Sequence, residues 1–337
     1  MDTKTPSLCG AYQGIFNIGA AVGTRSIRRE REFIAAHYNS VTAENRMKFE
    51  EIHPEEQRYD FDATDEIIKF AEQNGMAVRG HTLVWHNQTP DWVFEDAAGA
   101  PASRALVLER LESHAYAVMG RYRGKIHAWD VVNEAIEDKK ESVLRETKWL
   151  STVGEDYLEQ AFRIAHKADP SASLFYNDYN ETDPVKRDKI YRLVRSLLDA
   201  GAPVHGIGMQ GHWNLQGPSI GEIREAIELY ASLGVRLHIT ELDISAFAFE
   251  DRRSDLLAPT EEMERLLTQR YDEVFRVFRE YRSVIDSVTF WGAADTHTWL
   301  DGFPVRGRLN WPLPFDRELK PKPAFWRIIE HSASSKK

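Results

Sequence analysis

The sequence is short of the features that mark several large classes of protein. It has a single cysteine, Cys9, which cannot form an internal disulfide. A reducing compartment is therefore expected, although a secreted bacterial enzyme can also lack disulfides. No stretch approaches the roughly 18 consecutive apolar residues of a membrane-spanning helix. Residues 1–7 are polar and lack the apolar core of a secretory signal. The chain is expected to be cytoplasmic if Met1 is the native start, and secreted if a leader precedes it.

A net positive charge is also absent, because 53 acidic residues outnumber 43 basic ones. The formal net charge is −10, and this excess of negative charge argues against nucleic acid or an anionic membrane as the main partner. A glycine-rich phosphate loop is absent, because residues 208–211 do not follow the pattern of a dinucleotide-binding fold. A neutral substrate and no cofactor are therefore expected.

What the chain does contain is an alternation of short apolar runs with longer amphipathic segments. Its 337 residues, 42% of them hydrophobic, suffice for two average domains or one large α/β barrel. Eight runs are predicted to be strands, at residues 12–17, 40–44, 77–83, 126–133, 173–177, 206–210, 236–240 and 287–291. Six segments between them are predicted to be helices, at residues 62–74, 105–120, 155–168, 184–200, 220–233 and 262–281.

This alternation predicts the α/β class. Strands that alternate with helices form right-handed βαβ units and a parallel sheet. Eight such units favour a single (β/α)8 TIM barrel over a doubly wound sheet. No linker divides the chain, so residues 1–337 are predicted to form one catalytic domain with a frayed tail at 332–337.

Chemically distinctive side chains gather at the ends of the predicted strands. Active sites of (β/α)8 barrels lie at the C-terminal ends of the strands. Seven of the eight predicted strands end in such side chains, which indicates a single functional rim. The residues concerned are Glu44, Asn45, His81, Trp85, His86, Asn133, Glu134, Asn177, Asp178, Tyr179, Gln210, His212, Glu241, Asp243 and Trp291.

Two glutamates, Glu134 and Glu241, each close an apolar run. Burying an unpaired carboxylate costs several kcal/mol, so two of them at matching strand ends indicate a shared site rather than two structural ion pairs. Glycoside hydrolysis needs an acid and a second carboxylate. The apolar neighbours of Glu134 suit a protonated acid, whereas the polar neighbours of Glu241, among them Asp243 and His212, suit an ionised nucleophile.

The tryptophans and histidines refine this hypothesis. Trp85, Trp291 and Trp299 fall at or just after strand ends and are expected to line a sugar groove, because flat aromatic rings cover the C–H faces of sugars. A metal is not expected, because His81 and His86 do not share a face and the first predicted strand lacks a His-x-His pair. The core is expected to hold His238, Trp129, Trp149 and Trp326.

Six motifs, in order and spacing, resemble glycoside hydrolase family 10, the endo-β-1,4-xylanases. The most specific are Trp129-Asp130-Val131-Val132-Asn133-Glu134 and Thr240-Glu241-Leu242-Asp243. The others lie at residues 42–49, 81–86, 208–212 and 290–292, and the register holds from about Gly10 to Glu330. The resemblance implies a retaining endo-β-1,4-xylanase that cleaves xylo-oligosaccharides or xylan fragments by double displacement.

The resemblance also implies roles by position. Glu134 resembles the general acid/base and Glu241 the nucleophile, with their carboxyls about 5–5.5 Å apart in a retaining enzyme. Asn133 resembles the residue that holds the sugar 2-hydroxyl, and His212 with Asp243 resembles the pair that orients the nucleophile. The residues that resemble the walls of the subsite next to the scissile bond are Lys48, His81, Trp85, Gln210, Trp291 and Trp299. Those that resemble the next glycone subsite are Glu44, Asn45 and Gln88, and Tyr179 resembles a residue that stacks on an aglycone sugar.

Some points stay open at the level of sequence. Lys48 reaches either substrate or solvent. Arg46 stands where the family often has a smaller or acidic residue, and it is expected to point to solvent. Without a leader or a carbohydrate-binding module in the sequence, the resemblance is to the intracellular branch, which acts on xylo-oligosaccharides. Decoration of the substrate with glucuronic acid is left open.

Two other functions compete with xylan cleavage. Related barrels serve as sugar-binding lectins or inhibitors, but these usually lose one catalytic carboxylate and this chain keeps both. A β-1,4-glucanase is the second alternative. Closure of Trp291 and Trp299 over a pentose ring would exclude it, because glucose carries an additional hydroxymethyl group.

Overall fold

Eight parallel strands close into a barrel in the computed structural model, which describes residues 5–138 and 141–333. They are β1 (Asn17–Val22), β2 (Ser40–Ala43), β3 (Ala77–Val84), β4 (Ala128–Asn133), β5 (Ser173–Asp178), β6 (Gly206–Met209), β8 (Arg236–Ser245) and β9 (Ile285–Phe290). Each strand pairs with the next, and β9 pairs with β1 to close the ring. The predicted TIM barrel is confirmed. One further described strand, β7 (His212–Asn214), pairs with β8.

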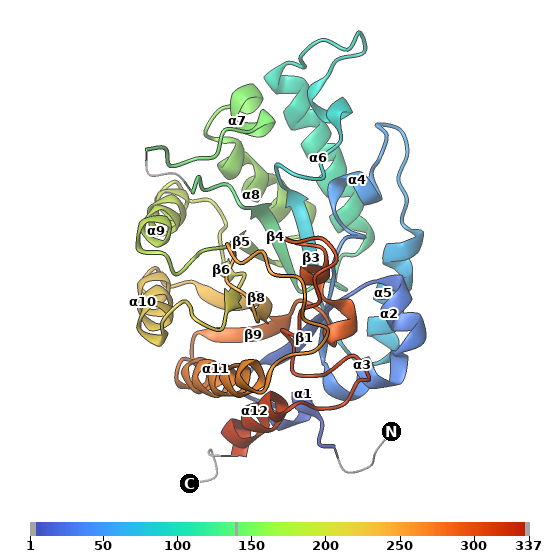
Figure 1. Ribbon diagram of the computed structural model, residues 1–337. Coiled ribbons are helices and arrows are strands. Elements are labelled where there is room, and N and C mark those ends of the chain that lie inside the picture. Colours follow the sequence, from blue (N-terminus) through green and yellow to red (C-terminus); the bar gives the residue numbers. More distant parts are fainter. Residues whose placement is uncertain (1–4, 139–140, 334–337) are drawn as a thin grey trace.

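Helices surround the strands on all sides (Figure 1). The long ones are α5 (Asp62–Gln73), α6 (Arg104–Arg121), α8 (Tyr157–Ala168), α9 (Pro184–Asp199), α10 (Ile220–Ala231) and α11 (Glu261–Glu280). The predicted helices match these six within two residues at each end. The sequence did not predict the shorter ones, which are α1 (Leu8–Ala11), α2 (Thr24–Arg29), α3 (Arg31–His37), α4 (Phe49–Ile52), α7 (Lys148–Val153) and α12 (Pro323–Ala333), nor the 3₁₀ turns η1 (Asp91–Phe94), η2 (Asp295–His297) and η3 (Trp299–Asp301).

Local signals explain where helices begin. Ser219 caps α10, because its Oγ accepts from the Glu222 N–H at 3.2 Å while the Glu222 carboxylate accepts from the Ser219 N–H at 2.7 Å. Asp183 caps α9 by accepting from two backbone N–H groups, and Pro184 occupies the first helical position. Caps of this kind fix the points at which the chain leaves the barrel rim and turns back.

The prediction of a strand at residues 12–17 is wrong, because β1 begins only at Asn17. Tyr12 directly follows α1, and its buried hydroxyl donates to the Ile328 carbonyl oxygen of α12 at 2.7 Å. Its ring stacks on Phe16 and packs edge-on against Phe275 of α11. These apolar side chains serve contacts with helices, so their run does not mark a strand.

Two further expectations need correction. Glu241 does not close its strand, because β8 continues to Ser245 after an irregularity in its pairing with β9 between Ile239 and Leu242. Trp326 is not in the core: it is 42% exposed on α12, on which its neighbour Phe325 is buried.

The remaining core expectations hold. Trp129, Trp149 and His238 are buried, as predicted. Of the predicted tail, Ser332 and Ala333 end α12, and residues 334–337 lie outside the described part of the chain. Within residues 5–138 and 141–333, no helix is both long and apolar enough to cross a bilayer.

Candidate active site

A cavity of about 790 Å³ opens at the C-terminal ends of the barrel strands, where the sequence predicted the functional rim. It brings together eleven of the predicted site residues: Lys48, His81, Trp85, Asn133, Glu134, Tyr179, Gln210, His212, Glu241, Trp291 and Trp299. The predicted residues Glu44, Asn45, Gln88 and Asp243 do not belong to its lining. A single cavity thus holds both glutamates and all three predicted groove tryptophans.

Glu134 sits immediately after β4, where the chain turns with a positive φ of 57°. Its backbone N–H still donates to the Asn177 carbonyl oxygen of β5 at 2.9 Å, so the ladder holds the turn at its start. Its carboxylate accepts from Trp85 Nε1 at 2.8 Å and from Gln210 Nε2 at 3.0 Å. The expected apolar setting is therefore wrong at the carboxylate, because the apolar neighbours in sequence are buried in the strand packing.

Glu241 is held by donors on both carboxylate oxygens. Asn177 Nδ2 donates to Oε1 at 2.9 Å, and His212 Nε2 lies 3.1 Å from Oε2. Burial acts to raise the pKa of Glu241, but the hydrogen bond from His212 and the charges of His81 and His212 outweigh it, so the pKa is lowered. The carboxylate is therefore ionised, as a nucleophile requires.

His212 carries the compensating charge. Its Nδ1 lies 3.0 Å from Asp243 Oδ1, and Trp299 Nε1 donates to the other oxygen of Asp243 at 2.7 Å. Burial acts to lower the pKa of His212, but Asp243 and Glu241 together raise it well above its ordinary value. A protonated imidazole has two N–H donors. Nε2 is hydrogen-bonded to Glu241, whereas Nδ1 and Asp243 Oδ1 form an ion pair without a hydrogen bond. Asp243 thus lies behind His212, as the resemblance implied.

A chain of amide side chains connects the two glutamates. Gln210 Nε2, which donates to Glu134, also lies 3.4 Å from Asn133 Oδ1. Asn177 Nδ2, which donates to Glu241, also donates to Asn133 Oδ1 at 2.8 Å. Each amide spans two acceptors, so the geometry of one carboxyl is coupled to that of the other.

Lys48 is buried at the rim rather than solvated. Its Nζ donates to Asn45 Oδ1 at 2.8 Å and lies 4.9 Å from the centre of the Trp85 ring. Burial lowers its pKa, and the nearby carboxylates of Glu241, Glu44 and Glu134 only partly offset this effect. A buried ammonium that faces the cavity is suited to donating to a sugar hydroxyl.

The other predicted rim residues lie beside the cavity. Gln88 Nε2 donates to Glu50 Oε1 at 3.1 Å. Burial raises the pKa of Glu44, although the charges of Lys48 and His297 oppose this rise. Arg46 is exposed and pairs with Glu51 at 2.5 Å, as expected of a solvent-facing side chain.

Several residues at the site were not predicted from the sequence. Asn177, named only as a strand end, is a buried donor to Glu241. Phe303 stacks on Trp299 with ring centroids 5.1 Å apart, and Phe249 lies beside Phe303. Both phenylalanines are exposed, and no pattern in the sequence marked them. The other unpredicted lining residues are Asn87, Asp138, Asn180, Asn214 and Glu250.

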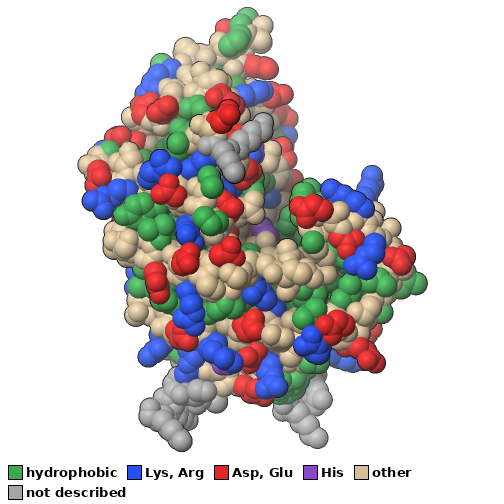
Figure 2. All heavy atoms as spheres, turned by 60° about the vertical axis from the view of Figure 1, so that its left-hand side comes forward, with side chains coloured by type: hydrophobic (Ala, Val, Ile, Leu, Met, Phe, Trp, Pro, Cys, Tyr) green, Lys and Arg blue, Asp and Glu red, His purple; other side chains and the backbone are tan. Residues whose placement is uncertain are grey.

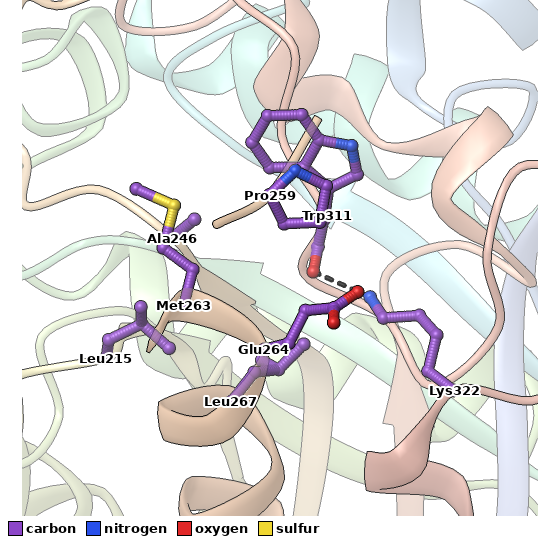
Figure 3. A pocket seen from close by; sticks show the side chains of 8 residues that line it. All are labelled: Leu215, Ala246, Pro259, Met263, Glu264, Leu267, Trp311 and Lys322. Atoms are coloured by element: carbon purple, nitrogen blue, oxygen red, sulfur yellow. Dashed lines mark hydrogen bonds between the residues drawn. The ribbon is translucent and has the colours of Figure 1, made fainter. Parts of the chain in front are cut away.

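A second cavity lies away from this site, between α11 and the loop that carries Trp311 (Figure 3). Lys322 Nζ donates there to the Trp311 carbonyl oxygen at 2.8 Å. This second cavity has a volume of about 10 Å³, which is room for about one water molecule. Among the described residues, no group of three or more His, Cys, Asp or Glu side chains is arranged to hold a metal ion.

Comparisons with known proteins show the family to which the chain belongs. A family model described as "Glycosyl hydrolase family 10" matches residues 7–331. Endo-1,4-beta-xylanase B of Paenibacillus barcinonensis is 67% identical over 329 residues, which covers 98% of this chain and 99% of that protein. An endo-1,4-beta-xylanase of Geobacillus stearothermophilus is 55% identical over 331 residues, covering 98% and 99%.

Solved structures show the same similarity in three dimensions. The crystal structure of xylanase XynB from Paenibacillus barcinonensis complexed with a conduramine derivative has a TM-score of 0.96 and 66% identity, covering 97% of this chain and 99% of that one. A mutant structure in complex with xylotriose has a TM-score of 0.95 and 53% identity, covering 97% and 100%.

Proposed function

The chain belongs to glycosyl hydrolase family 10 and is an endo-1,4-β-xylanase, and from that premise we propose that Glu134 is its general acid/base and Glu241 its nucleophile. The observation that carries this assignment is the contrast between the two carboxyl settings. Glu241 faces His212, whose pKa is raised, whereas Glu134 accepts from an indole and an amide. An acid and a nucleophile need such different electrostatic settings.

The first step forms a covalent intermediate. A carboxylate oxygen of Glu241 attacks the anomeric carbon while the bond from that carbon to the leaving oxygen breaks. Glu134 gives its proton to the leaving oxygen, which departs as a sugar hydroxyl. The imidazolium of His212 holds the attacking carboxylate in place and keeps it ionised.

The second step releases the sugar. The Glu134 carboxylate removes a proton from water, and the water oxygen bonds to the anomeric carbon as its bond to Glu241 breaks. Two successive inversions retain the configuration. This mechanism requires the two carboxyls to lie about 5–5.5 Å apart, and a crystal structure with bound sugar would measure that separation.

We propose xylo-oligosaccharides and xylan fragments as the substrates. The cavity combines three tryptophans with amide and ammonium donors, which suits neutral sugar rings. On the face seen in Figure 2, basic and acidic side chains are interspersed rather than segregated, so this face does not favour a polyanion such as nucleic acid. Lys48, His81, Asn133, Gln210, Trp85, Trp291 and Trp299 are proposed to hold the ring that is cleaved, Glu44, Asn45 and Gln88 the next glycone ring, and Tyr179 an aglycone ring.

Replacement of the nucleophile tests the mechanism. The Glu241→Ala variant is expected to lose turnover of xylo-oligosaccharides by about 10⁴-fold or more while its fold stays intact by circular dichroism. With an activated aryl xylobioside, added azide is expected to restore turnover and to give a glycosyl azide of inverted configuration, which NMR detects. Unchanged cleavage of xylan by this variant would disprove the assignment.

A matched control and two product measurements complete the test. Glu112→Ala, at an exposed position on α6, is expected to behave like the wild type. If the wild-type protein bound xylo-oligosaccharides and released no product, a sugar-binding lectin would be favoured instead. Comparable rates on aryl xylobioside and aryl cellobioside would show that Trp291 and Trp299 do not exclude glucose.

Two organisational predictions stand beside the mechanism. We expect residues 1–337 to form a single domain, and the pairing of strand β1 with strand β9 supports this expectation. A single domain predicts one calorimetric unfolding transition. A cytoplasmic location remains a prediction from the sequence, and fractionation of the source cells would test it.

A further inference from the structure

The chain turns sharply at the residue that carries the proposed acid. Glu134 has a φ of 57°, which is unfavourable for a residue with a β-carbon. Contacts from elsewhere must therefore hold the turn. The Tyr176 hydroxyl accepts from the N–H groups of Ala135 at 3.1 Å and Ile136 at 3.2 Å, and it donates to Asp178. These bonds fix the donor side of the turn.

A single side chain, Arg145, fixes the acceptor side. Its Nε donates to the carbonyl oxygen of Glu134 at 3.2 Å, and its Nη2 donates to that of Ile136 at 3.2 Å. Its own backbone N–H donates to the Ala135 carbonyl oxygen at 2.8 Å. Arg145 therefore binds three consecutive carbonyl groups that begin at the proposed acid.

The guanidinium is itself anchored to the wall of the cavity. Nη2 also donates to the Tyr179 hydroxyl at 2.7 Å and lies 3.2 Å from Asp138 Oδ2. Lys186 is buried, and its Nζ forms an ion pair with Asp138 Oδ1 at 2.8 Å. The same Nζ lies 3.4 Å from the centre of the Tyr179 ring. Tyr179 and Asp138 both line the cavity. Arg145 thus connects this wall to the backbone of Glu134.

We propose that Arg145 is a positioning residue that aims the Glu134 carboxyl at the leaving-group oxygen. This inference rests on the proposed role of Glu134. An acid must lie within about 2.6–3.2 Å of the atom it protonates. Without the guanidinium, the turn at Glu134 loses two of its bonds and the carboxyl no longer has a fixed distance from that atom.

Two substrates separate positioning of the acid from general damage. The leaving sugar of xylotetraose must be protonated, whereas the phenolate of 2,4-dinitrophenyl xylobioside departs without a proton. For both, kcat/KM covers only the steps up to the glycosyl-enzyme. Arg145→Gln is expected to lower kcat/KM roughly 10- to 100-fold for xylotetraose and less than about threefold for the dinitrophenyl substrate. Equal losses on the two substrates would overturn the proposal.

Further variants keep the test decisive. Arg145→Lys is expected to show the same selective loss, because one ammonium does not reproduce the two-pronged contact. Full recovery with lysine would overturn the proposal. Should Arg145→Gln fail to fold, Tyr179→Phe removes one anchor of the guanidinium and keeps the ring. This variant is expected to show a smaller loss with the same selectivity, and a non-selective loss would contradict the proposal.

Two controls distinguish this inference from the proposed function. Glu134→Gln must show the selective loss if Glu134 is the acid. If Glu134→Gln shows no selective loss, the proposed function fails. If Glu134→Gln shows the selective loss and Arg145→Gln does not, only the inference about Arg145 fails. Arg104→Gln removes another arginine that holds a backbone carbonyl, that of Val153, and that pairs with Asp156; none of these three residues lines the cavity. It is expected to leave both rates near wild type.

Discussion

At the scale of single residues, the charge on His212 decides the state of the proposed nucleophile. Glu241 is buried, and burial alone would raise the pKa of its carboxyl. The imidazolium reverses this effect because Asp243, 3.0 Å away on its other side, stabilises the positive charge. Glu241, His212 and Asp243 therefore form a row in which the imidazolium lies between two carboxyl groups.

This arrangement predicts the effect of removing the imidazolium. Glu241 must be ionised to attack, so kcat/KM falls as the pH drops through its pKa. In His212→Asn the raising effect of burial is no longer opposed by that charge, so the pKa of Glu241 rises. The acid limb of the kcat/KM profile is then expected to move to higher pH, measured on an aryl xylobioside.

The control is a histidine whose loss leaves the site alone. His205 lies at the opposite end of the barrel beside the start of β5, and burial lowers its pKa, so it is neutral near pH 7. His205→Asn is expected to leave the acid limb in place. An acid limb in His212→Asn that coincides with that of the wild type would contradict the electrostatic role.

How much of the site could be predicted follows from what strand positions reveal. Glu134 and His212 were identified because polar residues that follow buried strands in a barrel converge on one rim. Arg145 was missed because it lies in a loop, and nothing local marks a contact with the Glu134 carbonyl eleven residues earlier. Phe249 and Phe303 were missed for the same reason, since their partners come from separate loops.

At the scale of elements, the site requires a residue without a side chain at Gly208 of strand β6. Gly208 faces Asn177 of β5, and a β-carbon at this position would lie 2.2 Å from Asn177 Oδ1 and 2.9 Å from Thr240 Cγ2. Asn177 accepts from the Thr240 hydroxyl at 2.7 Å and donates to Glu241. Glycine in β6 therefore leaves the space that lets a β5 amide reach a β8 carboxylate.

Gly208→Ala is expected to displace Asn177. The variant should lose about 1–3 kcal/mol of unfolding free energy through overpacking. It should also lose kcat, measured well below its unfolding temperature, because Glu241 loses a donor. The free energy is measured by urea unfolding.

A second glycine provides the comparison. Gly120 on α6 is exposed, and a β-carbon there meets no atom within 4 Å. Gly120→Ala is expected to gain up to about 1 kcal/mol of stability with unchanged kcat. A Gly208→Ala enzyme with wild-type kcat would show that Asn177 does not assist the nucleophile.

Element prediction succeeded for six of the seven described helices longer than ten residues, with α12 missed, and it failed for the shorter helices. Helices such as α9 and α11 show an apolar stripe over several turns, so their limits were predicted closely. Helices of four to seven residues, such as α1 and α3, span too few turns to show one. Strand β7 has three residues and exists only through its pairing with β8. The position of Glu241 inside β8 depends on an irregular pairing, which a single strand's sequence does not display.

At the scale of the whole molecule, closure of the barrel makes distant segments depend on one another. β1 pairs with β9, and Tyr38 after α3 donates to the Ala293 carbonyl oxygen after β9 at 2.6 Å. The count of alternating units predicted this closure, because eight parallel strands form a ring. The sequence did not predict which polar groups the barrel buries without a charged partner. The burial of such a group depends on how loops from several strands pack together.

One such group links global stability to pH. Glu181 follows the cavity residue Asn180 and is buried. Its Oε1 accepts from Trp213 Nε1 at 3.1 Å, whereas its Oε2 has no hydrogen-bond partner within the described part of the chain. Burial raises the pKa of this carboxyl to about 7, despite its hydrogen bonds and the charges of His212 and Lys186.

Glu181→Gln should therefore change the pH dependence of stability in a defined direction. Between pH 4.5 and about 7 the folded carboxyl binds more protons than the unfolded one, so the contribution of Glu181 to stability falls as pH rises. At about 1.4 kcal/mol per pKa unit, the full loss is about 3 kcal/mol. Glutamine does not titrate, so the variant should gain about 2–3 kcal/mol relative to wild type between pH 5 and pH 8, measured by urea unfolding at both values. Glu112→Gln, an exposed position, should run parallel to the wild type, and parallel behaviour of Glu181→Gln would mean that the buried carboxyl does not titrate in this range.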